Sequence, residues 1–132
     1  ETITGLKSHA IVPRPQDHAL ATYAPLLKKS DGRIDWNKPA QLIEAFIRGM
    51  TPWPGAFAFL DNKRLKIFKA KAKEQECTQA AGTVIRGFSD ELRIATGRGA
   101  LSIREIQGAS GKRLHIRDYL RGHNIKPGSV FT

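Results

Sequence analysis

The segment AFAFLDNKRLKIFKAKAK, residues 56–73, decides the fold class of this chain. AFAFL at 56–60 and RLKIFKAKAK at 64–73 contain aromatic and aliphatic residues, and Asp61-Asn62 stands between them as a turn signal. Two such runs joined by a tight polar turn are typical of a β-hairpin. We therefore predict an antiparallel pair of strands here.

The basic residues of the second strand change face along its length. Side chains alternate in a strand, so Arg64 and Lys66 share one face while Leu65 and Ile67 share the other. Three later lysines have the parity of Leu65 and would point into the core of a regular strand: Lys69, Lys71 and Lys73. One extra residue would return them to solvent, so we predict a β-bulge between residues 66 and 69.

The chain after this hairpin continues the β pattern. The further strands that we expect are GTVIRGF (82–88), ELRIATG (91–97) and ALSIREI (100–106). Short turns separate them at Ser89-Asp90 and Arg98-Gly99. A short helix, HIRDYLRGH at 115–123, precedes a tail at 124–131 that can add a final strand. Several short strands with close turns predict a small antiparallel barrel or sandwich.

A helix is expected before the hairpin, over NKPAQLIEAFIRGM at 37–50. Asn37 can cap its start, and Pro39 falls in the first turn, where a missing N–H costs little. Gly49 and Thr51-Pro52 end it. Its apolar residues recur at helical spacing and are interpreted as a core face rather than a partner site: Leu42, Ile43, Phe46, Ile47 and Met50.

The turn Pro52-Trp53-Pro54-Gly55 links this helix to the hairpin. The prolines restrict φ on both sides of a large aromatic residue, and the glycine permits a sharp reversal. We expect Trp53 to be buried where the helix meets the β domain, with a role in stability rather than in binding.

Residues 1–25 differ from the rest of the chain. ETITGLKSHA at 1–10 has few apolar positions and predicts only a helix stub, and Pro13, Pro15 and Pro25 favour an extended connector. The segment is interpreted either as the start of a piece cut from a longer protein or as an arm that packs on its own domain.

The net charge is large for a chain of 132 residues. Lys and Arg total 22 and Asp and Glu total 12, which gives +10 and a pI of about 10.2. This balance predicts either a solvated basic face or a polyanionic partner, of which nucleic acid is commoner than an anionic membrane. No apolar run approaches the roughly 20 residues that cross a bilayer, so no membrane partner is expected.

The basic residues gather in two segments, and both are candidates for contacts with RNA phosphates. The candidate binding residues are Lys63, Arg64, Lys66, Lys69, Lys71, Lys73, Arg98, Arg104, Lys112, Arg113 and Arg121. A ribbon of cations along a sheet can follow a phosphate backbone, whereas lysines on an exposed strand can also simply prevent aggregation. Phe57, Phe59 and Phe68 are expected in the core, so shape and phosphate recognition fits better than base stacking.

No catalytic site and no metal site is expected in this chain. His9, His18, His115 and His123 have no convincing catalytic neighbours, and there is no glycine-rich phosphate loop. Cys77 is the single cysteine, so the chain offers neither an internal disulfide nor the ligand spacing of a zinc site.

A series of short motifs resembles the C-terminal region of methionyl-tRNA formyltransferases over nearly the whole chain. Their order and spacing carry the resemblance: Ala-Thr-Tyr-Ala-Pro (21–25), Asp-Gly-Arg-Ile-Asp-Trp (31–36), Lys-Pro-Ala (38–40), Ile-Arg (47–48), Pro-Trp-Pro-Gly-Ala (52–56), Lys-Arg-Leu-Lys-Ile (63–67), Ala-Thr-Gly-Arg-Gly-Ala-Leu (95–101), Asp-Tyr-Leu-Arg-Gly-His (118–123) and Lys-Pro-Gly (126–128). Ala81 stands where the family's Pro-Gly-Thr-Val-Ile motif has proline.

The resemblance implies a fold and a division of labour. In that family a Rossmann-like catalytic domain binds 10-formyltetrahydrofolate, and a C-terminal barrel similar to an OB-fold helps to hold the tRNA. Residues 1–25 would be the end of the catalytic domain's last helix plus an extended linker. Residues 26–132 would be the barrel, a mainly β (α+β) domain with two short helices. The family's catalytic motifs have no counterpart here, so no catalytic residue and no cofactor is assigned to this chain.

The resemblance also implies partners. They are initiator Met-tRNA and the chain's own N-terminal catalytic domain, in a cytoplasmic monomer that serves translation initiation. The same barrel type follows the formyltransferase domains of amino-sugar formyltransferases and of formyltetrahydrofolate dehydrogenase, which need no RNA. A structural barrel without RNA contact is therefore the main alternative, and a free-standing single-strand-binding barrel is a third. The charge of +10 favours the tRNA-directed interpretation.

Overall fold

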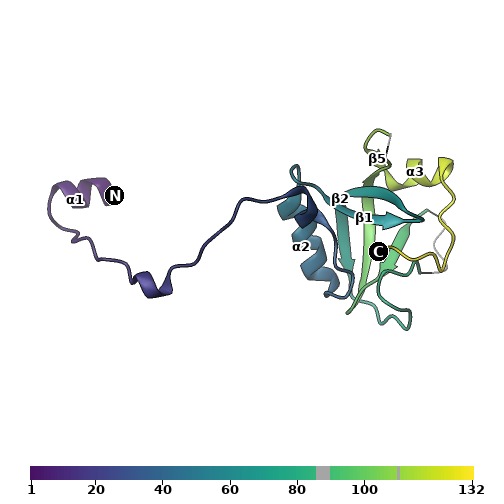
Figure 1. Cartoon of the computed structure of the whole chain (residues 1–132), viewed down its shortest axis with the longest axis horizontal. Helices are drawn as coiled ribbons and strands as arrows, with labels where there is room; N and C mark the ends of the chain where they lie inside the picture. The colour runs from purple at the N-terminus through teal and green to yellow at the C-terminus, as the bar shows by residue number, and fades with distance from the viewer. Residues whose placement is uncertain (86–89, 110) are drawn as a thin grey trace.

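The computed structural model describes residues 1–85, 90–109 and 111–132. The elements within them are α1 (Thr2–Lys7), η1 (His18–Leu20), η2 (Lys29–Gly32), α2 (Ala40–Met50), β1 (Ala56–Leu60), β2 (Lys63–Lys73), β3 (Leu92–Ala95), β4 (Ala100–Gln107), β5 (Leu114–His115) and α3 (Ile116–Gly122), where η denotes a 3₁₀ helix. Figure 1 shows the strands gathered into one body, with α2 against one side and an N-terminal arm that leads away. The arrangement confirms a mainly β domain with short helices that follows an extended segment.

The predicted hairpin is present. β1 pairs antiparallel with β2, in a register that places Ala56 opposite Ile67. Asp61 and Asn62 in the turn have φ values of 49° and 61°. Positive φ at both central residues gives a two-residue turn whose twist suits a hairpin, and Asp and Asn adopt this conformation more readily than other residues with a side chain.

Main-chain hydrogen bonds close the sheet into a barrel. Among the described residues the strand order is β1-β2-β4-β3, and β5 pairs with β4. Residues 82–85 pair with β3, and residues 128–132 pair both with that segment and with β1. At the last of these junctions the amide of Phe59 donates to the carbonyl of Thr132 at 2.7 Å. The tail thus pairs with the barrel through an isolated bridge and main-chain hydrogen bonds, where a final strand was expected. Residues 86–88 of the strand expected at 82–88 lie outside the described residues.

The core of the barrel is built from the inward faces of the strands together with α2. Its buried strand side chains include Leu65, Ile67, Ile94, Leu101, Ile103 and Ile106. Ile43 and Ile47 of α2 are buried in the same cluster. Because burial of such a side chain is worth about 1.5–3 kcal/mol, these two residues seat the helix on the sheet.

The helix differs from the sequence prediction at its start and on one face. α2 begins at Ala40, and Pro39 occupies its N-cap position. Asn37, the expected cap, lies in the preceding turn. Leu42 is 57% exposed, so its assignment to the core is wrong. Successive residues of a helix point about 100° apart around its axis, so Leu42 points away from the direction of its buried neighbour Ile43. The sheet covers a narrower face of the helix than the apolar residues of the sequence occupy.

The tryptophan of the proline-rich turn is 55% exposed, so the expected burial of Trp53 is wrong. The main chain anchors this turn, since the amide of Gly55 donates to the carbonyl of Met50 at 2.8 Å. The turn therefore does not need the indole to fill the space between helix and barrel. The buried tryptophan is Trp36, whose ring meets that of Phe131 edge-on at a centroid distance of 5.9 Å.

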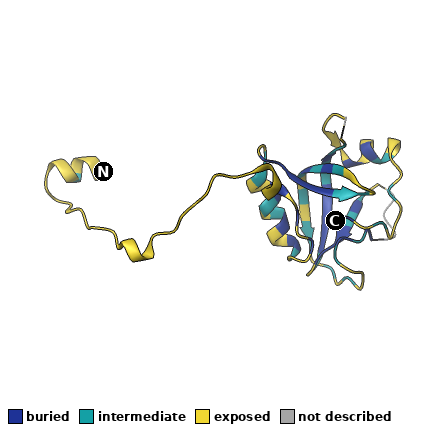
Figure 2. Cartoon of the chain, viewed as in Figure 1, coloured by how far each residue is buried: buried dark blue, intermediate teal, exposed yellow. Residues whose placement is uncertain are grey.

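The arm is exposed along its length. Residues 6–31 all lie open to solvent, as the yellow ribbon in Figure 2 shows. In the ranges that the structure describes, the arm therefore does not pack on its own barrel, which was one of the two interpretations of this segment.

Candidate nucleic-acid interface

A double break in register lies in the β2–β4 pair. The register shifts between Ile67 and Lys69, and it shifts again between Lys69 and Ala70. Phe68 on β2 and Arg104 on β4 are the residues that these shifts leave without a partner in the ladder. A bulge bends a strand and changes the direction of the side chains that follow it. This break lies between the apolar residues that face the core and the lysines that would otherwise follow them inward. The bulge predicted between residues 66 and 69 is confirmed.

The bulge places lysines of β2 in solvent. Leu65 and Ile67 before it are buried, whereas Lys69 and Lys71 after it are exposed and Ala70 between them is half-buried. A regular strand would have given these lysines the direction of Leu65. The register break is therefore what puts positive charge on the outer surface of the sheet.

A cavity of about 530 Å³ lies over the bulge, between α2 and the strands, and we call it the bulge groove. Its lining residues are Glu44, Arg48, Phe68, Lys69, Ala70, Lys71, Arg104, Glu105 and His115. Phe68 and Ala70 supply apolar surface. The other side chains are charged or titratable, and the cations exceed the acids. The groove therefore combines an apolar lining with an excess of positive charge.

Glu44 joins α2 to the strand that carries the lysines. Its carboxylate accepts a hydrogen bond from the main-chain amide of Ala72 at 2.7 Å. It also lies 3.6 Å from the guanidinium of Arg48 and 3.9 Å from the ammonium of Lys71. Glu44 therefore fixes one wall of the bulge groove while it neutralises part of the charge there.

The second acid of the groove has its own cation. The guanidinium of Arg113 pairs with the carboxylate of Glu105 and lies over the ring of Phe68, 4.6 Å from the ring centroid.

The cations of the groove differ in whether an acid already pairs with them. Arg104 lies 3.8 Å from the carboxylate of Glu91. Lys69 takes part in none of the ion pairs within the described part of the chain. Its charge is available to a ligand.

The structure brings together only part of the predicted binding set. Lys69, Lys71 and Arg104 line the bulge groove, and Arg113 lies on Phe68 beside it. The other members are Lys63 at the start of β2, Arg64 and Lys66 on the outer face of the hairpin, Lys73 and Arg98 at a second cavity, Lys112 before β5, and Arg121 on α3.

Two basic residues of the groove were not in the predicted binding set. Arg48 arrives from α2 and His115 from β5. Helical spacing places Arg48 one turn after Glu44, but no local pattern shows that this side of the helix meets β2. Charge clustering along the sequence could not find either residue, because folding alone brings these segments together.

Arg64 stacks on an aromatic ring instead of standing free. Its guanidinium lies over the ring of Phe57 at 3.7 Å, and its Nε is buried with no hydrogen-bond partner in the described residues. Phe57 is 6% exposed and belongs to the buried core, as expected, and it lies beneath Arg64 and beside Phe59. Phe59 and Phe68 are half-buried and outside the core cluster, so the expectation that they lie in the core is wrong.

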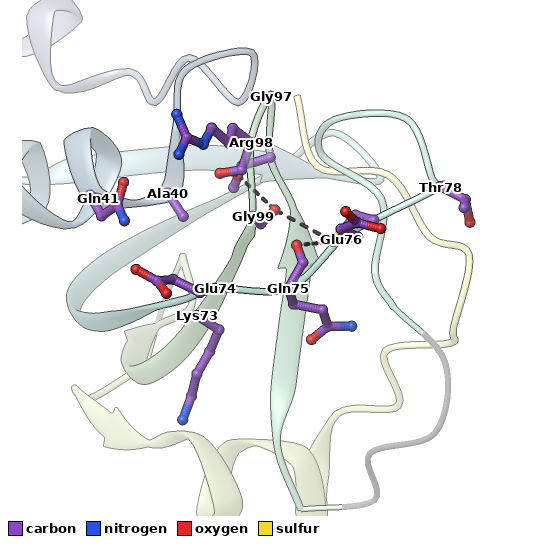
Figure 3. A pocket seen from close by; sticks show the side chains of 12 residues that line it. Ala40, Gln41, Lys73, Glu74, Gln75, Glu76, Thr78, Gly97, Arg98 and Gly99 are labelled. Atoms are coloured by element: carbon purple, nitrogen blue, oxygen red, sulfur yellow. Dashed lines mark hydrogen bonds between the residues drawn. The ribbon is translucent and has the colours of Figure 1, made fainter.

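A second cavity, of about 680 Å³, lies at the far end of β2 (Figure 3). Lys73 and Arg98 line it beside acidic side chains, so its charge is mixed. The thiol of Cys77 donates to the carbonyl of Gly99 at 3.4 Å, and burial raises the pKa of this thiol. Because the thiolate is the nucleophilic form, a thiol in this environment is a weak nucleophile.

Two further searches bear on the kind of site that the chain can carry. Within residues 1–85, 90–109 and 111–132, no three side chains of the types that bind metals come together in a possible metal site. In the same residues, no helix combines the length and the apolar character needed to cross a bilayer.

The chain is similar to proteins that transfer formyl groups. The family model described as "Formyl transferase, C-terminal domain" matches residues 26–124. The methionyl-tRNA formyltransferases of Geotalea uraniireducens and Desulfotalea psychrophila are 48% and 46% identical to this chain over 130 residues. The matches cover 98% of this chain but only 41% and 40% of those proteins, in their C-terminal part. The chain thus spans about two fifths of the length of these curated relatives.

A solved structure shares the fold. The crystal structure of HypX from Aquifex aeolicus in complex with tetrahydrofolic acid superimposes with a TM-score of 0.60 at 20% sequence identity. The superposition covers 89% of this chain and 21% of that one. At this identity the likeness shows the architecture of the domain.

Proposed function

Because the chain belongs to the family of formyl transferase C-terminal domains, we propose that it is the tRNA-binding domain of a methionyl-tRNA formyltransferase. The full-length protein carries a catalytic domain ahead of this one, takes the formyl group from 10-formyltetrahydrofolate, and transfers it to initiator Met-tRNA in the cytoplasm, as a monomer. This chain holds the tRNA, and the catalytic domain supplies the folate site and the chemistry. The observation that carries the proposal is the cationic bulge groove.

The bulge groove offers cations in an arrangement that suits an extended polyanion. Lys69 and Lys71 project from one face of β2, two residues and so about 7 Å apart along the strand. Arg104 flanks them from β4 and Arg48 from α2. Contacts with phosphates set the position and orientation of a nucleic acid without reading its bases. We therefore assign affinity for RNA to these residues and the choice of tRNA to the catalytic domain.

Binding of this kind affects the ground state and the transition state equally. Contacts to phosphates remote from the reacting amino group are the same before and during formyl transfer. Removing them therefore raises the KM for tRNA and leaves kcat unchanged.

Steady-state kinetics of the full-length enzyme test this assignment. The double variant Lys69→Ala/Lys71→Ala should raise the KM for Met-tRNA and leave kcat within about twofold of wild type. Lys7→Ala is the matched control, because it removes an exposed lysine from α1 in the arm. An unchanged KM would leave the family assignment standing but would remove the RNA-binding role from the groove.

A structural barrel that contacts no RNA is the competing function. Glu44 and Glu105 favour it, because these acids already neutralise part of the positive charge in the groove. Lys69 favours RNA binding, because it has no such pair in the described part of the chain. The kinetic test separates the two functions.

A further inference from the structure

The outer face of the β1–β2 hairpin combines cations with aromatic rings. The register places Phe57 opposite Lys66 and Phe59 opposite Arg64. Side chains alternate along a strand, and Leu65 between the two cations is buried in the core. The four side chains therefore share the face of the hairpin that is turned away from the core.

Two arginines of this face lie on the rings beneath them. The guanidinium carbon of Arg64 is 3.7 Å from the ring centroid of Phe57, and that of Arg33 is 5.7 Å from the ring centroid of Phe59. Arg33 comes from outside the hairpin, through a parallel bridge with Phe57 on the edge of β1 opposite β2. We call this set the hairpin face: Arg33, Phe57, Phe59, Arg64 and Lys66.

The ring, rather than a protein acceptor, holds the guanidinium of Arg64 in place. A separation of 3.7 Å is van der Waals contact, so one face of the flat group covers the ring and the other is turned outward. The buried Nε of Arg64 has no hydrogen-bond partner in the described residues. Arg64 is half-buried and Arg33 is exposed. The hairpin face therefore presents flat cations, each backed by an aromatic ring.

Acids do not neutralise the hairpin face. Within the portion of the chain that the structure describes, Arg33, Arg64 and Lys66 take part in none of the ion pairs. Asp61 in the turn is the single acid of the hairpin sequence 56–73. The bulge groove, by contrast, contains two acids that pair with its cations. The charge of the hairpin face is thus complementary to a polyanion.

We propose that the hairpin face binds an unpaired nucleotide of the RNA, with the base stacked on the guanidinium of Arg64 and a phosphate on Lys66. The inference rests on the proposed function, in which the bulge groove holds the backbone of the same RNA. Bases stack on arginine planes as they do on aromatic rings. A paired base in a helix has neighbours on both faces, so the surface selects unpaired nucleotides.

The hairpin face and the bulge groove follow one another along β2. Lys69 comes three residues after Lys66, which is about 10 Å along a strand. Both lysines are turned away from the core, because the bulge reverses the parity between them. An RNA strand that leaves the bulge groove therefore reaches the hairpin face within a few nucleotides.

An acidic protein segment suits the hairpin face less well than RNA. Phe57 lies beneath Arg64 and is only 6% exposed, so it gives a protein partner little apolar area to bury. Carboxylates bind the N–H edge of a guanidinium, whereas the outward feature here is its flat face. A nucleotide offers both a flat base for that face and an anion for Lys66.

Oligonucleotide binding by this chain tests the proposal with variants that keep the charge and lose the flat group. Arg64→Lys should raise the Kd for a short oligoadenylate at least about fivefold, because a stacked base contributes that factor or more. Its salt slope should stay unchanged, and so should its Kd for an RNA duplex. Arg33→Lys should act in the same direction by a smaller factor. Arg14→Lys in the exposed arm is the matched control.

The exposed position of Arg33 keeps the test valid if Arg64→Lys disturbs the fold, which circular dichroism detects. Wild-type affinity for oligoadenylate in Arg64→Lys and Arg33→Lys would overturn the proposal. An equal loss of duplex binding would also overturn it, since the arginines would then contact phosphates alone. Tighter binding of a polyglutamate peptide than of oligoadenylate would assign the face to an acidic protein segment.

The two proposals can fail separately. The salt slope of tRNA binding reports the bulge groove through Lys69→Ala and Lys71→Ala. A slope that responds to these variants, with no effect of Arg64→Lys on oligoadenylate, would leave the proposed function standing and remove this inference. Loss of oligoadenylate binding in Arg64→Lys, with a slope that ignores the groove variants, would support the hairpin face and contradict the role of the groove.

Discussion

The main-chain amide of Ala72 on β2 donates a hydrogen bond of 2.7 Å to the carboxylate of Glu44 on α2. β1 pairs with β2 only as far as Ile67, so the second half of β2 extends past its neighbour, and the helix side chain takes the place of a strand there. The same carboxylate lies near Arg48 and Lys71. One bond therefore both protects a strand edge and sets the wall of the bulge groove.

Removal of this acceptor should destabilise the barrel. In Glu44→Ala the half-buried amide of Ala72 loses its partner, and we expect a loss of about 1 kcal/mol in the free energy of unfolding, near the lower end of the cost of an unsatisfied donor. Glu44→Gln keeps an oxygen at the same place and should cost less. Urea unfolding followed by circular dichroism measures both variants. Equal destabilisation in the two would show that the charge, and not the hydrogen bond, holds the helix.

The two tryptophans should differ sharply in their contribution to stability. Trp36→Ala removes a ring buried against Phe131 and should lower the free energy of unfolding by about 3–5 kcal/mol. Trp53→Ala should change it by less than about 0.5 kcal/mol in this chain, because its ring is exposed. Denaturant titrations of both variants provide the measurement. A large destabilisation by Trp53→Ala would mean that the indole anchors the turn after all.

Stability should depend on pH through Glu91. A hydrogen bond from Arg93 lowers the pKa of the Glu91 carboxyl from its ordinary value of 4.5, and Ser102 and Arg104 lower it further, against an opposing effect of burial. A carboxyl whose pKa is lower in the folded than in the unfolded state stabilises the fold above the unfolded value. That stabilisation is lost as the pH falls through the folded pKa.

The free energy of unfolding should therefore decrease as the pH falls below the ordinary value of 4.5. Glu91→Gln should be less stable than wild type at neutral pH, and the difference between the two should shrink as the pH falls. Urea titrations at a series of pH values follow both proteins. A difference that stays constant down to acid pH would show that the ionisation of Glu91 does not matter.

Local chemistry was enough to predict the hairpin and the bulge. Asp61-Asn62 is a turn signal whatever surrounds it, and the parity of Lys69 against Leu65 depends only on the alternation of a strand. Neither argument needs knowledge of the rest of the molecule. Both predictions are accordingly confirmed at the residues that carry them.

Features that depend on how elements meet could not be predicted in this way. Arg48 reaches the bulge groove because α2 docks on the sheet beside β2, where Glu44 bonds to Ala72, and this docking joins segments far apart in the chain. The sequence shows Arg113 only as a positive charge, whereas in the structure its guanidinium pairs with Glu105 and lies over the ring of Phe68. Trp53 looked like a core residue because its turn is rigid, although the turn is anchored by the hydrogen bond from Gly55 to Met50 and the indole stays exposed.

The salt dependence of tRNA binding by this chain tests the RNA-binding role most directly. The plot of log Kd against log salt concentration reports how many phosphates the protein contacts. We expect steep weakening with salt, and Lys69→Ala and Lys71→Ala should each lower the slope by roughly 0.7–0.9 for every phosphate that the variant no longer neutralises, alike for different tRNAs. Lys7→Ala should leave the slope unchanged. Binding that ignores salt, or a slope that neither groove variant alters, would contradict the account and favour a structural barrel.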